Sequence, residues 1–124
     1  GVTYKPDGYP SVSPYLLVRD AARTLEFVKE VFGAQQLRVI GKTDTAGIMH
    51  AEARIDDSVI MMGEVADAAD THVHVYVPDV EATFAKAKAM GDHVVQELER
   101  QGDGDRRGGV HDGNGVVWWI SRQE

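Results

Sequence analysis

Apolar and polar side chains alternate without a break between residues 71 and 77, which is the most regular pattern in the chain. In an extended strand the three valines of this stretch fall on one face, whereas His72, His74 and Tyr76 fall on the other. The valine face needs a hydrophobic layer behind it. The opposite face carries two imidazoles and a phenol, which favours a semi-polar cavity in front of the strand.

Two helices are predicted, one in each half of the chain. Asp20 is placed to cap a helix that runs to about Phe32, and Asp79 is placed to cap a helix from Val80 to Met90. A glycine follows each helix directly, as is common just past a helix end. These signals are local, so we expect both helices to form as predicted.

The remaining apolar runs predict strands, separated by polar segments. The polar segments are an arm at 1–11 with little regular structure, a linker at 64–70 and a Gly, Asp and Arg loop at 101–109. The predicted strands are 13–18, 36–40, 48–55, 59–63, 71–77, 94–98 and 116–121.

The two halves of the chain have the same order of elements, a strand, a helix and then further strands. This indicates an internal repeat of about 60 residues, with repeats at 12–63 and 71–122. One such unit is too small to bury both faces of its sheet. We therefore predict a single α+β domain at 12–122, in which two βαβββ repeats form a curved mixed sheet around a cavity, with the helices outside.

Composition and charge narrow the range of partners. The chain has 124 residues and a formal net charge of -7, which is unsuited to nucleic acid because phosphate binding needs clustered Lys and Arg. No apolar run approaches the length of a membrane span, and no signal peptide is visible at 1–8. The chain contains no cysteine, which fits a cytoplasmic location. We expect a small molecule as partner, rather than nucleic acid or membrane.

Several short motifs follow one another along the chain. They are Ser-Pro-Tyr-Leu-Leu-Val at 13–18, Glu-Phe-Val-Lys at 26–29, Phe-Gly-Ala at 32–34, Met-His-Ala-Glu at 49–52, Gly-Asp-Arg at 104–106 and Trp-Trp-Ile at 118–120. Taken together with the repeat, their order and spacing resemble the vicinal oxygen chelate superfamily of glyoxalases, bleomycin-resistance proteins and extradiol dioxygenases. The resemblance covers about residues 12–122 and extends to its PhnB-like branch. Three departures from that branch stand at Val28, Asp103 and Gly113.

The resemblance raises the question of a metal. Metal-dependent members of the superfamily place His, Glu or Gln at four cavity-facing positions, which here correspond to Ser13, Met61, His72 and Trp119. Only His72 is a strong ligand for a divalent cation, because such a site needs several anionic or imidazole donors. We therefore predict no metal at this position and no other cofactor.

A displaced metal site is the alternative. His72 and His74 lie on one strand face, about 7 Å apart, and His50 and Glu52 could face the same cavity. Three imidazoles and a carboxylate can hold zinc or iron. In the other interpretation these are cavity residues satisfied by hydrogen bonds.

A binding site is predicted on the cavity face of the strands. Aromatic residues there suit a flat or apolar ligand. Arg106 could clamp a ligand carboxylate or phosphate, or could instead pair with Asp103 or Asp105 and order its loop. The candidate ligand-binding residues are Tyr15, His50, Glu52, Met61, His72, His74, Tyr76, Arg106 and Trp119.

Three functions are compatible with this pattern. The first, which we favour, is a metal-free protein that binds a small molecule and sequesters it. The second is a lyase or dioxygenase-type enzyme that uses a displaced metal, or His and Glu acid–base chemistry. The third is an interaction module whose cavity is filled by its own side chains. A homodimer is also expected, because relatives commonly pair and sheet edges need covering.

Overall fold

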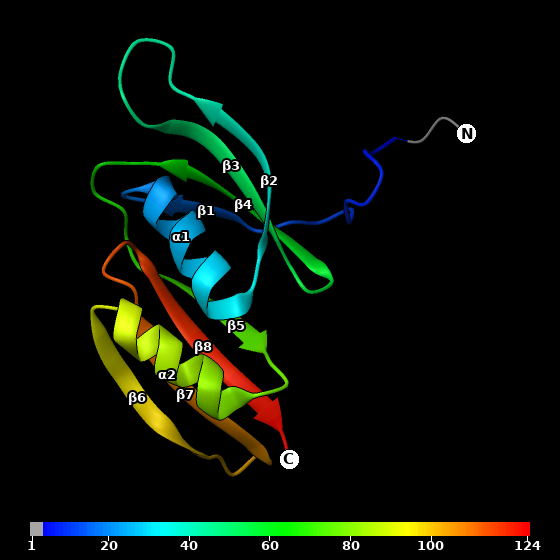
Figure 1. The fold of residues 1–124 in the computed structure, drawn as a ribbon, viewed down its shortest axis with the longest axis vertical. Helices are drawn as coiled ribbons and strands as arrows, with labels where there is room; N and C mark the ends of the chain where they lie inside the picture. Colours follow the sequence, from blue (N-terminus) through cyan, green and yellow to red (C-terminus); the bar gives the residue numbers. More distant parts are fainter. Residues whose placement is uncertain (1–3) are drawn as a thin grey trace.

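The protein is described by a computed structural model in which residues 4–124 are placed (Figure 1). Residues 1–3 of the predicted N-terminal arm lie outside the described residues, and the rest of the arm forms turns and bends without a helix or strand. The elements are β1 (Tyr15–Val18), α1 (Ala21–Phe32), β2 (Gln35–Gly41), β3 (Ile48–Ile55), β4 (Ser58–Glu64), β5 (Thr71–Tyr76), α2 (Val80–Met90), β6 (His93–Arg100), β7 (Asp105–His111) and β8 (Val116–Gln123).

The strands form two four-stranded sheets with the same topology. Their strand orders are β1-β4-β3-β2 and β5-β8-β7-β6. In each sheet the first strand of the repeat pairs in parallel with the last, and the other pairs are antiparallel. The α+β fold class and the two βαβββ repeats are thus confirmed. The repeats contribute separate sheets, and α1 and α2 lie on the same side of them (Figure 1).

Both helices begin and end where the capping residues predict. The Asp20 side chain accepts a hydrogen bond from the Arg23 N–H at 3.2 Å, and Asp79 accepts one from the Ala82 N–H at 3.1 Å. Gly33 ends α1 with a φ of 65°, a left-handed conformation that glycine adopts without steric cost. Side-chain capping therefore sets the start of each helix.

Each sheet has one face covered by a helix and one face that no helix covers, here called the open face. In β1, Leu16 and Val18 are buried toward α1, whereas Tyr15 and Leu17 are about half exposed on the open face. The alternation of β5 is confirmed, since its valine side packs against the core and its polar side is exposed. The valines are Val73, Val75 and Val77, and the open-face residues are His72, His74 and Tyr76.

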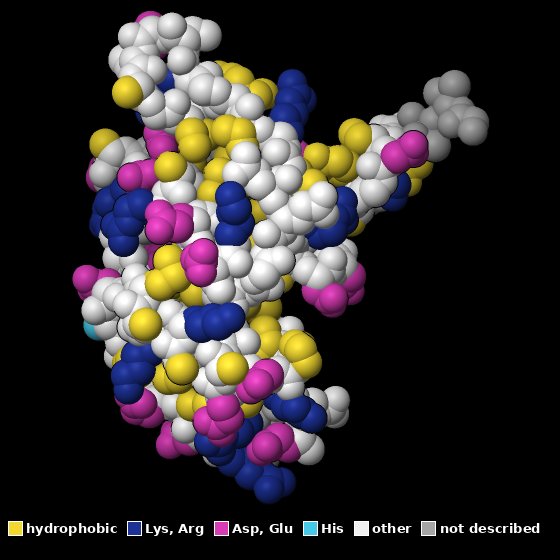
Figure 2. Space-filling model, in the orientation of Figure 1, with side chains coloured by type: hydrophobic (Ala, Val, Ile, Leu, Met, Phe, Trp, Pro, Cys, Tyr) yellow, Lys and Arg dark blue, Asp and Glu magenta, His cyan; other side chains and the backbone are white. Residues whose placement is uncertain are grey.

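The N-terminal arm leaves the body of the protein and overhangs a hollow. Figure 2 shows the arm projecting from the first repeat, with the surface hollowed below it. A cleft of about 470 Å³ lies here, between the arm, the turn that joins β3 to β4, and β5. Its walls include Pro10, Val12, His74 and Tyr76. The arm therefore lies close to candidate residues of the second repeat.

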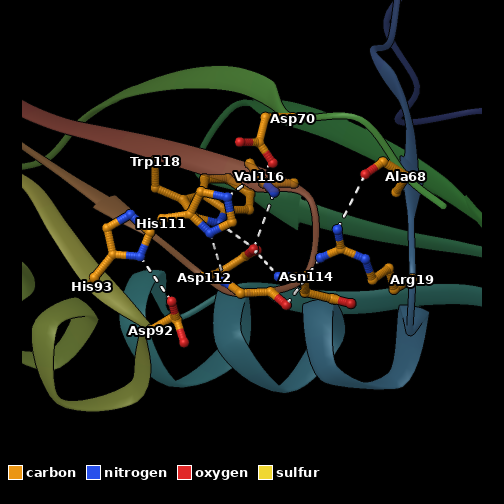
Figure 3. Close-up of polar contacts among 11 residues, drawn as sticks. Arg19, Ala68, Asp70, Asp92, His93, His111, Asp112, Asn114, Val116 and Trp118 are labelled. Carbon is orange, nitrogen blue, oxygen red and sulfur yellow. Dashed lines mark hydrogen bonds and ion pairs between the residues drawn. The ribbon is translucent and has the colours of Figure 1, made fainter.

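The two repeats are joined by a buried polar connection at the turn between β7 and β8. Asn114 of this turn donates from its amide to the Asp20 carbonyl at 2.7 Å and to Thr24 Oγ1 at 2.8 Å, and its Oδ1 accepts from the Asp20 N–H at 2.8 Å. Asp112 in turn accepts hydrogen bonds from the Asn114 N–H and from the indole of the buried Trp118 (Figure 3). The turn thereby anchors the start of α1 to the second sheet.

The prediction of a loop at 101–109 was wrong, because β7 begins at Asp105. Gly108 and Gly109 are strand residues that allow large rings to pack on the backbone. A Cβ atom at Gly108 would lie 2.4 Å from Phe84 Cε1, and one at Gly109 would lie 2.7 Å from Trp119 Cζ3. The glycines of this segment therefore reflect close packing, although glycine-rich sequence usually indicates a loop.

Candidate functional site

Four predicted site residues meet on the open face of the first repeat. The register places Tyr15 of β1 and Glu52 of β3 beside Met61 of β4. His50, two residues before Glu52, lies with its Nε2 2.7 Å from Glu52 Oε2 and its Nδ1 3.4 Å from the Tyr15 hydroxyl. A carboxylate, an imidazole and a phenol thus form a chain across three strands.

Glu52 is the most buried polar group of this cluster, with 5% of its surface exposed. Burial by itself raises the pKa of a carboxyl group, but the hydrogen bonds from His50 and from the Tyr9 hydroxyl outweigh burial and lower the pKa of Glu52. The same bond to Glu52 raises the pKa of Tyr9. Tyr9 belongs to the polar arm, and no sequence pattern assigned it to the site.

Aromatic and imidazole rings cover the open face of the second repeat. Trp119 and His72 are stacked with ring centroids 6.2 Å apart, and the indole Nε1–H of Trp119 donates to His72 Nδ1 at 3.0 Å. His74 packs edge-on against Tyr76 at 4.6 Å. These four residues were all predicted for the site, and they form two ring pairs along one sheet.

A polar group that the sequence did not assign completes this face. The Tyr76 hydroxyl donates to Asp105 Oδ2 at 2.8 Å, and this bond raises the pKa of Tyr76. Arg107 binds Asp105 at 3.3 Å and Asp103 at 3.1 Å. Asp105 and Arg107 reach this face because the segment is a strand, which the sequence pattern did not indicate.

Arg106 lies apart from the other predicted site residues. Its Nη2 binds Glu81 of α2 at 2.7 Å, on the face of the sheet that the helix covers. The ion pairs that the sequence considered for Arg106, with Asp103 or Asp105, are made by Arg107 instead. Neighbouring strand residues point to opposite faces, so a shift of one position moves the guanidinium across the sheet.

Two histidines near the β6 and β7 ends form a separate pair. His93 and His111 stack with ring centroids 4.9 Å apart, and each lies beside a carboxylate, Asp92 for His93 and Asp70 for His111 (Figure 3). The Gly113 N–H donates to Nδ1 of His111 at 2.8 Å. Both ring nitrogens of His111 are therefore engaged within the protein.

The donor set at the four positions used by metal-dependent relatives does not fit a divalent cation. Trp119 can only donate there, and its N–H is directed at the one imidazole of the set, His72. Met61 is a soft thioether and Ser13 a neutral hydroxyl.

The alternative, displaced set of ligands is divided between the two sheets. His50 and Glu52 lie on β3 of the first repeat, whereas His72 and His74 lie on β5 of the second. Within residues 4–124, no group of three His, Asp or Glu side chains is placed to hold a metal ion.

Also within this part of the chain, no helix is long and apolar enough to cross a membrane.

Comparison with known proteins identifies the family. The model of the Glyoxalase/Bleomycin resistance protein/Dioxygenase superfamily matches residues 11–120. The chain belongs to this superfamily. One relative is the uncharacterized protein Mb0911c of Mycobacterium bovis, which is 32% identical to this chain over 127 residues. The aligned region covers 91% of this chain and 83% of the relative.

Solved structures show the same fold at lower identity. TioX from Micromonospora sp. ML1 has a TM-score of 0.75 and 23% identity, over 93% of this chain and 99% of that chain. FosX, the fosfomycin resistance protein of Listeria monocytogenes, in a complex with Mn(II) and sulfate, has a TM-score of 0.70 and 16% identity, over 93% of each chain. A PhnB protein from Bacillus cereus has a TM-score of 0.71 and 15% identity, over 91% of this chain and 99% of that chain.

Proposed function

We propose that this superfamily member binds a small molecule on its open faces, without the metal site of its metal-dependent relatives, and acts by sequestering its ligand. The observation that carries the proposal is the bond from the Trp119 indole to His72. It engages the one strong metal ligand of the four positions with an N–H group that cannot coordinate a metal ion. The same two rings form a flat stacked surface suited to a planar ligand.

The surfaces of the two repeats favour a flat ligand that is neutral or cationic. Aromatic groups are available on both sheets, since Tyr15 is 51% and Tyr76 is 61% exposed. The buried carboxylate of Glu52 provides an acceptor beside them, and the net charge of -7 disfavours anions. Bleomycin is one candidate by analogy with the resistance proteins of the superfamily.

A homodimer is part of the proposal. Tyr15, Leu17 and Tyr76 are large apolar side chains left at least half exposed on β1 and β5, the strands at one edge of each sheet. A second copy would cover these edges and close the open faces into cavities. Light scattering at tens of micromolar tests this, and a monomer mass would count decisively against it.

An enzymatic function is the second candidate, and one observation favours it. Glu52, His50 and Tyr15 form a chain in which the carboxylate orients the imidazole and the imidazole faces a hydroxyl. In such an arrangement the imidazole can act as a general base toward the hydroxyl or toward a substrate proton. A substrate turned over without added metal, with activity lost in His50→Asn, would establish this function in place of sequestration.

Metal content and retained ligand decide between these functions. We expect elemental analysis of protein purified without added metal to find no stoichiometric zinc, iron, nickel or manganese. Titration with bleomycin should quench the fluorescence of Trp119. Trp119→Phe should weaken binding measured by calorimetry, because the buried Trp118 that remains should not respond to the ligand. Stoichiometric metal that is lost in His72→Ala would overturn the proposal and make the enzyme the leading function.

A further inference from the structure

The N-terminal arm presents Tyr9 to the open face of the first repeat through a tight turn. The Tyr9 N–H donates to the Pro6 carbonyl at 3.3 Å, and Gly8 has a φ of 80°, the left-handed conformation that the third residue of a type II turn needs. Arg54 Nη2 donates to the Gly8 carbonyl at 2.8 Å. Two side chains of β3, Arg54 and Glu52, therefore hold this turn against the sheet.

The carboxylate beneath Tyr9 requires a hydrogen-bond donor at that point. Glu52 is 5% exposed, and its Oε2 is paired with His50 at 2.7 Å. Its Oε1 accepts from the Tyr9 hydroxyl. A buried charged oxygen without a partner is costly, so water or a ligand hydroxyl must take the place of Tyr9 whenever the arm leaves. A neutral hydroxyl meets this need, whereas a phenolate or carboxylate would be repelled.

The rest of the arm is weakly attached. Tyr4 is 88% and Val12 is 83% exposed, and Tyr9 itself is only partly buried. No residue of the arm between positions 4 and 11 belongs to a strand. Its release gives up the hydrogen bonds from Tyr9 to Glu52 and from Arg54 to Gly8 but breaks no sheet pairing of residues 4–11.

We propose that Glu52 and His50 recognise a neutral phenolic hydroxyl of the ligand, and that Tyr9 occupies this position as a competitor supplied by the chain itself. The inference rests on the proposed function and names the ligand class for the first repeat. A tethered group acts at a high effective concentration. The apparent affinity for an external phenol is therefore the intrinsic affinity multiplied by the fraction of molecules whose arm is released.

Calorimetric titration of the 124-residue chain with 2-naphthol tests this inference. Tyr9→Ala should bind 2-naphthol on the order of tenfold more tightly than the unmodified chain, a factor that corresponds to about 1.4 kcal/mol. Tyr9→Phe keeps the ring without the hydroxyl and should lie between the two. Tyr4→Ala, at the exposed end of the arm, is the matched control and should leave the affinity unchanged.

A second variant and a second probe isolate the hydroxyl and its acceptor. Glu52→Gln in the Tyr9→Ala background replaces the charged acceptor by a neutral amide and should reduce the gain. 2-Methoxynaphthalene, which has no hydroxyl hydrogen, should gain less from Tyr9→Ala than 2-naphthol does. Equal affinities of Tyr9→Ala and the unmodified chain for 2-naphthol, or no binding to either, would overturn the inference. The proposed function is judged separately by metal content and bleomycin binding, so it can stand if this inference fails.

Discussion

Asn114→Ala should lower the free energy of unfolding, because the Asn114 side chain makes three hydrogen bonds that join the two repeats. Its side chain is 2% exposed and bonds to both backbone groups of Asp20 and to the Thr24 hydroxyl, which is also buried. At about 1 kcal/mol for each bond, the loss is roughly 3 kcal/mol. For a domain of this size that corresponds to a fall in melting temperature of roughly 10 °C.

Urea unfolding at a fixed protein concentration measures this loss. The midpoint should fall while the slope with urea stays constant, because the surface exposed on unfolding is unchanged. Gln123→Ala is the control, since Gln123 is exposed at the end of β8 and its side chain makes no hydrogen bond within residues 4–124. A loss below about 1 kcal/mol for Asn114→Ala would refute the argument, because water would then replace all three bonds at little cost.

Three further predictions concern the packing of β7 and the charge of Glu52. Gly108→Ala should destabilise the protein by about 1–3 kcal/mol, measured by urea unfolding, because its Cβ atom would lie 2.4 Å from the Phe84 ring. Gly109→Ala should shift the emission of Trp119, whose ring would lie 2.7 Å from the new atom, and unchanged fluorescence would contradict this packing. The stability advantage of the unmodified chain over Glu52→Gln should be complete above about pH 4.3 and should fade as the pH falls further. The reason is that the pKa of Glu52 is lowered in the folded state, and an advantage that grows as the pH falls would refute this sign.

The sequence by itself determined the features that depend on neighbouring residues. Asp20 and Asp79 predicted the helix starts, because a capping side chain bonds to a backbone N–H only three residues away. The alternation from residue 71 to residue 77 predicted the two faces of β5, because side-chain direction in a strand has a period of two. The order of elements in the two halves then indicated the fold.

Only the tertiary structure decided the features that depend on residues distant in the chain. The segment at 105–111 is a strand that pairs with β6 and β8, and its glycines leave room for the rings of Phe84 and Trp119. That strand also determined which arginine, Arg106 or Arg107, reaches the open face.

The candidate site likewise combines features set by neighbouring residues with features set by residues distant in the chain. His50 and Glu52 share a face by local alternation, which the sequence reveals, and the register of three strands then brings them to Tyr15. The bond from Tyr9 to Glu52 joins residues 43 positions apart, across a turn that no hydrophobic pattern marks. Local hydrogen bonding and strand periodicity can be read from a sequence, whereas contacts that depend on the folding back of a polar arm require the structure itself.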